Sequence, residues 1–204
     1  MKWITPKKGL RVLGIAESFL KKSPINKSLL AGVVMRADLQ IDGFGFSLCT
    51  VGGLDATDAV LSIYNQLGRP DVRVIVLSGT IISLYNIIDL NKLYECTGAP
   101  IIAVSYEESS GIEKFLVDLP DAEKRIEIYR RNGPRIPVRL RSGYIVYIRP
   151  VGITITNATN ILNLFAIHGR YIEPLRVSRL LARSLFRFLF LQSFKKPEIP
   201  EKTT

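Results

Sequence analysis

Histidine, cysteine and long apolar runs are scarce in this 204-residue chain. The sequence has one histidine and two cysteines, and neither Cys49 nor Cys96 has the spacing of a metal site. Both cysteines lie in apolar surroundings, so we expect reduced core residues and a cytoplasmic location. No stretch reaches the roughly 18 uncharged apolar residues that a membrane span needs. A disulfide scaffold, a cysteine metal site and a membrane-spanning protein are therefore excluded.

Acidic residues are also in short supply. Asp and Glu total 18 against 28 Lys and Arg, which gives a net charge of +10. The excess is concentrated late in the chain: residues 124–149 hold eight basic residues and one acid, and residues 170–204 hold eight basic residues and three acids. A basic region of this kind is typical of a protein whose partner is a polyanion, although it is also compatible with an ordinary soluble surface.

The apolar residues are sufficient for a full core. They make up 47% of the chain, and the length fits one domain. We expect a single domain over residues 1–194 and a flexible C-terminal tail over residues 195–204.

The apolar spacing changes several times along the chain and predicts a mixed α/β protein. Asp42-Gly43 is a hairpin signal between the second and third strands. The expected strands cover residues 11–16, 29–38, 44–51, 73–77, 101–104, 136–141 and 144–149. The expected helices cover residues 55–67, 85–96, 111–131 (split by Pro120), 156–167 and 174–192. Three strands with short connections, followed by alternating helices and strands, predict a ribonuclease H-like mixed sheet with helices on both faces.

Six segments, read together, resemble one family. They are residues 11–19 (RVLGIAESF), 51–58 (VGGLDATD), 74–79 (VIVLSG), 86–89 (NIID), 93–100 (LYECTGAP) and 173–178 (EPLRVS). In this order and spacing they are similar to the archaeal domain-of-unknown-function family ninety-nine, whose members are endonuclease V-like proteins. The resemblance runs from about residue 10 to residue 190.

The resemblance implies a nuclease scaffold that presents carboxylates to Mg²⁺. Endonuclease V cuts nucleic acid beside deaminated bases, and its acids come from the ends of two strands and the start of a helix. Mg²⁺ requires such hard oxygen ligands, and it activates water and neutralises phosphate charge. This chain departs from the family pattern in that Ala16, Gly52 and Ser78 stand where acids are expected.

The carboxylates that remain are Glu17, Asp55 and Asp58. They are the candidate catalytic residues, and Glu17 and Asp58 are the candidate metal ligands. Because neighbouring strand positions face opposite sides of a sheet, Glu17 does not simply replace an acid at position 16 unless a bulge turns it. Gly79, Tyr85 and Asn86 follow the fourth strand, where the family presents a cleft.

Each of these residues also has a purely structural interpretation. Asp55 and Asp58 suit the N-terminus of a helix whatever the function. Glu17 is compatible with a solvent-facing position, and Tyr85 and Asn86 with packing.

Two basic elements are candidates for nucleic-acid binding. At 100° per residue, the arginines of the last helix fall within an arc of about 80°; they are Arg176, Arg179, Arg183 and Arg187. The second element is a basic segment over residues 125–141 that contains Arg125, Arg130, Arg131, Arg135, Arg139 and Arg141. Tyr144 and Tyr147 lie beside it, and aromatic residues next to arginines suit stacked bases.

Three hypotheses remain open. The first is a protein that binds DNA or RNA on an endonuclease V-like scaffold, with a degenerate site and no cofactor. The second is an active Mg²⁺-dependent endonuclease on deaminated or single-stranded nucleic acid. The third is a homo-oligomer, with a dimer formed through the C-terminal helix, because Phe186 and Phe190 widen its apolar arc beyond one packing face. The face expected to pack on the sheet consists of Val177, Leu181, Leu185, Phe188 and Leu189.

Overall fold

The computed structural model describes residues 3–20, 25–109 and 111–191. Its strands are β1 (Arg11–Ser18), β2 (Lys27–Arg36), β3 (Ile41–Thr50), β4 (Val72–Ser78), β5 (Ile81–Ile82), β6 (Asn86–Ile87), β7 (Ile101–Ser105), β8 (Ile136–Arg139) and β9 (Ile145–Val151). Its helices are α1 (Ala56–Leu67), α2 (Leu90–Thr97), α3 (Glu113–Leu116), α4 (Ala122–Arg131), α5 (Ile155–Phe165) and α6 (Glu173–Leu191). The predicted tail over residues 195–204 lies outside the described residues.

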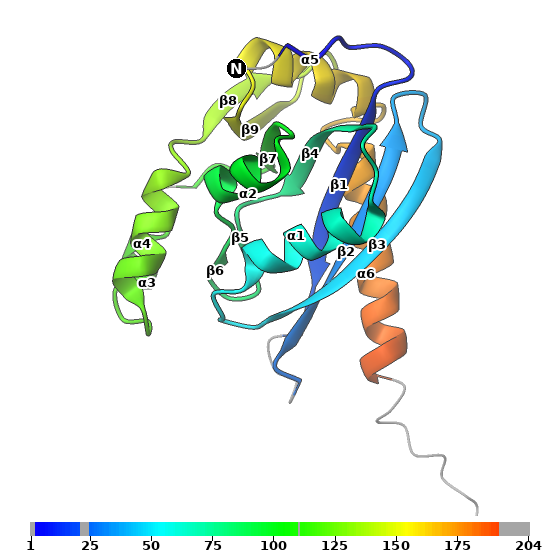
Figure 1. The fold of residues 1–204 in the computed structure, drawn as a ribbon. Coiled ribbons are helices and arrows are strands. Elements are labelled where there is room, and N and C mark those ends of the chain that lie inside the picture. Colours follow the sequence, from blue (N-terminus) through cyan, green and yellow to red (C-terminus); the bar gives the residue numbers. More distant parts are fainter. Residues whose placement is uncertain (1–2, 21–24, 110, 192–204) are drawn as a thin grey trace, which may run out of the picture.

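Seven strands form one mixed sheet in the order β3-β2-β1-β4-β7-β9-β8. The first three strands pair antiparallel, β1 pairs parallel with β4, and β4 pairs parallel with β7. At the other edge, β9 pairs antiparallel with β7, and β8 pairs antiparallel with β9. The helices α1 and α6 lie on opposite faces of this sheet (Figure 1). The fold class predicted from the sequence is confirmed.

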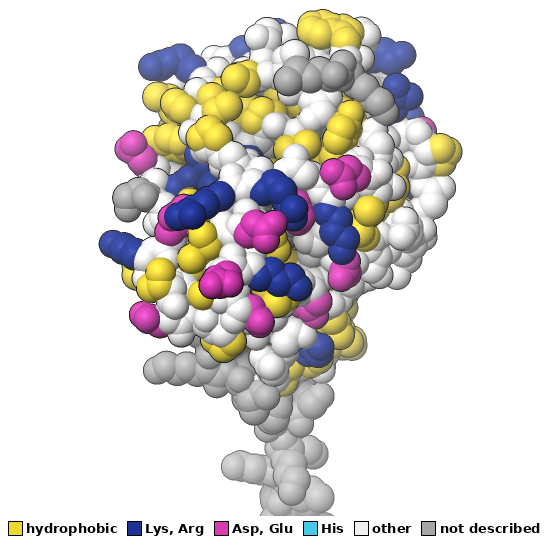
Figure 2. Space-filling model, turned by 60° about the vertical axis from the view of Figure 1, so that its left-hand side comes forward, with side chains coloured by type: hydrophobic (Ala, Val, Ile, Leu, Met, Phe, Trp, Pro, Cys, Tyr) yellow, Lys and Arg dark blue, Asp and Glu magenta, His cyan; other side chains and the backbone are white. Residues whose placement is uncertain are grey.

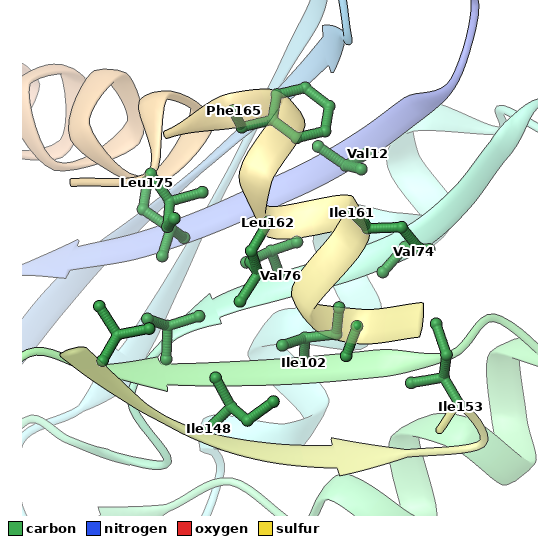
Figure 3. Packing of buried hydrophobic residues seen from close by; sticks show 14 of the residues in the cluster. Val12, Val74, Val76, Ile102, Ile148, Ile153, Ile161, Leu162, Phe165 and Leu175 are labelled. Carbon is green, nitrogen blue, oxygen red and sulfur yellow. The ribbon is translucent and has the colours of Figure 1, made fainter. Parts of the chain in front are cut away.

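The core is split by the sheet, because alternate residues of each strand face opposite sides. One side is covered by α5, whose Ile161, Leu162 and Phe165 point toward the central strands in Figure 3. Each such fully buried side chain contributes about 1.5–3 kcal/mol relative to an exposed one. The sheet residues that they meet are Val12, Val74, Val76, Ile102 and Ile148.

Three local predictions were wrong. The β2–β3 turn does not use Asp42-Gly43, which lie inside β3; the chain reverses at residues 37–40, with Leu39 in the left-handed region at φ 68°. The helix expected over residues 85–96 begins only at Leu90, because residues 86–87 form β6, and Asp89 caps the helix by accepting from the amides of Asn91 and Lys92. Cys49 is buried as expected, but Cys96 is exposed, because α2 buries the side that carries Leu90 and Leu93.

The rotation of α6 also differs from the prediction. The side chains of Ser178, Ala182 and Phe186 are buried, whereas Phe188 is 60% exposed and Leu189 45% exposed. Small residues on both elements explain the difference: a Cβ on Gly14 of β1 would lie 2.6 Å from Cβ of Pro174, and Ser178 Oγ donates to the Gly14 carbonyl over 2.7 Å. The face that approaches the sheet most closely is therefore chosen by small residues and not by the bulkiest ones.

Over the described residues, no helix is long and apolar enough to cross a membrane.

Candidate nucleic-acid interface

The parallel strands β1 and β4 end side by side, at Ser18 and Ser78. The register between β1 and β2 is unbroken up to Ser18, so no bulge turns Glu17 toward the face of Ala16. Gly14 contacts α6, so Ala16, two residues further on, faces α6 as well. Glu17 faces the α1 side. The strand ends therefore present a serine and an alanine, and no carboxylate, to the α6 side.

Glu17 is used as an anchor for the loop that precedes β6. Its carboxylate accepts a hydrogen bond from Ser28 Oγ over 2.6 Å, from the Ser83 amide over 3.0 Å and from Ser83 Oγ. That loop contains three consecutive non-glycine residues with positive φ, namely Ser83 at 46°, Leu84 at 55° and Tyr85 at 66°. Left-handed backbone costs an ordinary residue free energy, and the contacts of Glu17 help to hold it in place.

Arg125 of α4 secures the same loop from the other side. The side chain is buried, and its guanidinium donates to four carbonyl oxygens: those of Gly52, Gly53, Tyr85 and Pro120. No acid pairs with it among the described residues. A charge in this position is not available to a ligand, so this arginine of the basic segment is structural.

Asp55 stands at the N-cap position of α1 but does not cap the helix with its side chain. Its carboxylate accepts from the amide and the hydroxyl of Thr50 and, over 2.7 Å, from Asn86 Nδ2. Burial alone would raise the pKa of Asp55, but the hydrogen bonds from Asn86 and Thr50 outweigh it and lower the pKa below its ordinary value. Asn86 itself is fully buried, whereas Tyr85 stays partly exposed and stacks on Phe115.

Glu17 and Asp55 lie near Cys49, whereas Asp58 lies apart from them and contacts Lys92. Burial raises the pKa of the Cys49 thiol to about 11, and the negative charges of Asp55 and Glu17 add to this rise. Asp58 is exposed, and its carboxylate pairs with Lys92 Nζ at 2.8 Å. We refer to Glu17, Asp55, Ser83, Asn86 and Arg125 as the acid corner.

The acids of this region do not fit a divalent metal ion. Across residues 3–20, 25–109 and 111–191, no three His, Cys, Asp or Glu side chains are grouped as metal ligands. The carboxylate oxygens of Glu17 and Asp55 accept hydrogen bonds from amide and hydroxyl donors. A Mg²⁺ site needs free carboxylates that converge on one point.

A cavity of about 510 Å³ opens beside the acid corner. The α6 residues Arg179, Arg183 and Arg187 line it, together with Ser78 at the end of β4 and Glu17 of the acid corner. Arg179 Nη2 donates to Ser78 Oγ over 2.7 Å. Within the described part of the chain, no carboxylate lies within salt-bridge distance of these three arginines. We call this site the arginine cavity.

The other predicted arginines differ in how their charge is used. Arg176 pairs with Glu173, Arg130 pairs with Glu113, and Arg131 pairs with Asp89. Arg135 and Arg139 donate to the carbonyls of Ser109 and Gly143, and Arg141 is exposed. Figure 2 shows the α3–α4 side of the molecule, where basic and acidic side chains alternate. The pair of Arg176 with Glu173 spans one turn of α6 and follows the local spacing. The partners of Arg130 and Arg131 come from other elements, so local spacing could not predict those pairs.

The sheet order, with helices on both faces, defines a ribonuclease H-like fold of the endonuclease V type. The chain is similar to endonuclease V from Streptomyces avermitilis, with a TM-score of 0.62 at 18% identity, over 90% of this chain and 84% of that one. It is also similar to Ciona intestinalis endonuclease V in complex with a 24mer DNA containing an inosine followed by a ribo-adenosine. That TM-score is 0.57 at 12% identity, over 89% of this chain and 87% of that one.

The chain belongs to the endonuclease dU family, whose model matches residues 8–186. It is 39% identical over 183 residues to a UPF0215 protein of Pyrobaculum calidifontis, covering 89% of this chain and 100% of that protein. A protein of unknown function from Archaeoglobus fulgidus has a TM-score of 0.74 at 28% identity, over 86% of this chain and 97% of that one. The relation to endonuclease V expected from the sequence is confirmed at the level of the fold.

Proposed function

We propose that this protein binds nucleic acid through the arginine cavity and that its nuclease site is degenerate. One observation carries the proposal: at the end of β4, where the resemblance implies a metal-binding acid, Ser78 accepts a hydrogen bond from Arg179. The positive charge at the end of β4 therefore comes from the Arg179 guanidinium, which Ser78 holds in place and which would face a bound phosphate.

The charge and shape of the arginine cavity suit a phosphate backbone. A guanidinium stays protonated at all physiological pH values and offers a planar pair of N–H donors that matches phosphate oxygens. Arg183 and Arg187 extend the row along α6 from Arg179, so they suit successive phosphates of one strand. Among the described residues, Glu17 is the single acid that lines the cavity, and its oxygens accept hydrogen bonds from Ser28 and Ser83.

Binding without cleavage follows from the use of the acids. Hydrolysis of a phosphodiester by a scaffold of this type requires an activated water and a neutralised leaving group. Glu17 and Asp55 hold the loops of the acid corner, and Asp58 is paired with Lys92. No catalytic step is assigned to them.

The test is a titration of binding against salt. Duplex and single-stranded oligonucleotides are followed by fluorescence anisotropy, and contact with about six phosphates of a duplex gives a log–log slope near −5. Replacing Arg179, Arg183 and Arg187 together by Ala should weaken binding and flatten this slope by about 3. The matched control replaces Arg130 and Arg131, which are paired with acids, and should leave the slope unchanged. A slope that is flat in the wild type, or unaltered in the triple variant, contradicts the proposal.

The family supplies a reason for a second candidate, an active endonuclease, because this chain belongs to the endonuclease dU family. The test measures cleavage of deoxyuridine-containing DNA in the presence of Mg²⁺ or Mn²⁺. The Glu17→Gln variant, purified in the same way as the wild type, serves as the control. Cleavage that is lost in Glu17→Gln would establish this candidate and overturn the degenerate site. Equal traces of cleavage in both proteins would indicate a contaminating nuclease.

A further inference from the structure

A second cavity lies on the other flank of the arginine row of α6. It measures about 270 Å³ and is lined by Tyr106, Tyr171, Leu175 and Leu180, together with Arg179 and Arg183 of the arginine cavity. We call it the tyrosine cavity. Because the two cavities share these two arginines, a strand with its phosphates on the row has its bases within reach of the tyrosines.

The lining of the tyrosine cavity is apolar and open to solvent. Leu180 is 51% exposed and Tyr171 is 45% exposed. The rings of Tyr106 and Tyr171 are 5.2 Å apart and tilted by 60°. Exposed large apolar side chains are costly to hydrate. A group of them beside arginines indicates a ligand that has both a flat apolar part and a negative charge.

The two rings are also fixed in position. The Tyr106 hydroxyl accepts from the Ile172 amide over 3.2 Å, and Arg170 donates to the Tyr106 carbonyl. The Arg170 guanidinium lies 5.6 Å from the centre of the Tyr171 ring, and its other nitrogen pairs with Glu107. Such restraint lowers the entropy that is lost when a ligand stacks on the ring.

We propose that the tyrosine cavity holds one unpaired base of a single strand whose phosphates lie on Arg179 and Arg183. This inference rests on the proposed function and narrows it to single-stranded nucleic acid. The volume of the tyrosine cavity, about 270 Å³, lies just below the roughly 300–1,000 Å³ usual for drug-sized ligands. The cavity therefore suits one base and not a base pair. A base inside a duplex is stacked between its neighbours and cannot enter without being extruded.

The test compares two ligands with equal numbers of phosphates. One is a short oligothymidylate, and the other is an abasic strand of the same length. Fluorescence anisotropy should show that the wild type binds the thymidylate about tenfold more tightly, because stacking on an aromatic ring requires a base. Tyr171→Ala and Leu180→Ala should remove most of this preference and leave the affinity for the abasic strand unchanged. Tyr171→Trp should retain the preference.

The matched control is Phe44→Ala, since Phe44 is an aromatic residue that is 49% exposed but lies outside both cavities. It should keep the tenfold preference. Equal affinity of the wild type for the two strands, with binding still dependent on Arg179, Arg183 and Arg187, overturns the base site and leaves the proposed function intact. Absence of binding to either strand overturns both.

Discussion

The acid corner and the arginine cavity adjoin each other, yet they use charge in opposite ways. In the acid corner Arg125 is buried and Glu17 and Asp55 are partly buried, and all three form hydrogen bonds with amides, hydroxyls or carbonyls of the chain itself. In the arginine cavity the guanidinium groups are exposed, and among the residues that the structure describes only Arg179 has a hydrogen-bond partner, the neutral hydroxyl of Ser78. The first region should therefore determine stability, and the second should determine binding.

Arg125→Ala should have the largest effect. It removes the donor to the partly buried carbonyl oxygens of Gly52, Gly53 and Tyr85, at a cost of about 3–5 kcal/mol in the free energy of unfolding. Urea denaturation measures this loss. Lys124→Ala, at the exposed neighbouring position, should change stability by less than about 0.5 kcal/mol. If the two variants were equally stable, the guanidinium would not hold the acid corner together.

Asp55→Asn should cost about 1–3 kcal/mol, because an amide group cannot accept all the hydrogen bonds from Thr50 and Asn86. The pKa of Asp55 is lowered in the folded state, so its stabilisation is complete above the ordinary aspartate pKa and is lost as the pH falls through the folded value. The difference between variant and wild type should shrink when denaturation is repeated in acid. A difference that grows on acidification would refute this role for the carboxylate.

Ser78→Asp tests the boundary between the two regions. The new carboxylate should pair with Arg179, neutralise part of the arginine cavity and weaken binding of nucleic acid about tenfold, or about 1.4 kcal/mol. The free energy of unfolding should change little. Ser78→Asn, which is similar in size but neutral, is the control for anisotropy measurements. Tighter binding of Ser78→Asp in the presence of Mg²⁺ would show instead that one acid restores a metal site.

Arg183→Ala should have the smallest effect, a loss of about fivefold in affinity with a salt slope that falls by about 0.9. Arg131→Ala, by contrast, breaks the ion pair with the buried Asp89 and should lower stability without altering the slope. Reversed results for these two variants would place the binding surface on α4 and not on α6.

The fold could be predicted from the sequence because its strands and helices carry strong apolar patterns. The continuous apolar run of β4 and the helical spacing of α1 are examples. The turn at Leu39 could not be predicted, because leucine in a left-handed conformation gives no local signal. The rotation of α6 was missed for a related reason: Ser178 and Ala182 fix it by close approach, and small residues add little to an apolar pattern.

The candidate site was predictable in part. The missing acids at Ala16 and Ser78 and the arginine row of α6 were visible in the sequence. The burial of Arg125 was not, because arginine is ordinarily an exposed residue, and its four carbonyl partners come from loops far apart along the chain. The tyrosine cavity was missed because Tyr106, Tyr171 and Leu180 are brought together only by the packing of α6 on the sheet.

The close contact between Gly14 and Pro174 keeps α6, and with it the arginine row, near the end of β4. A single methyl group on Gly14 would meet the first turn of α6 at 2.6 Å and push the helix outward. Arg179 would then lose Ser78, and the walls of both cavities would separate. The bulk of the residue at position 14 would therefore set the distance between the arginine row and the end of β4, although this residue lines neither cavity.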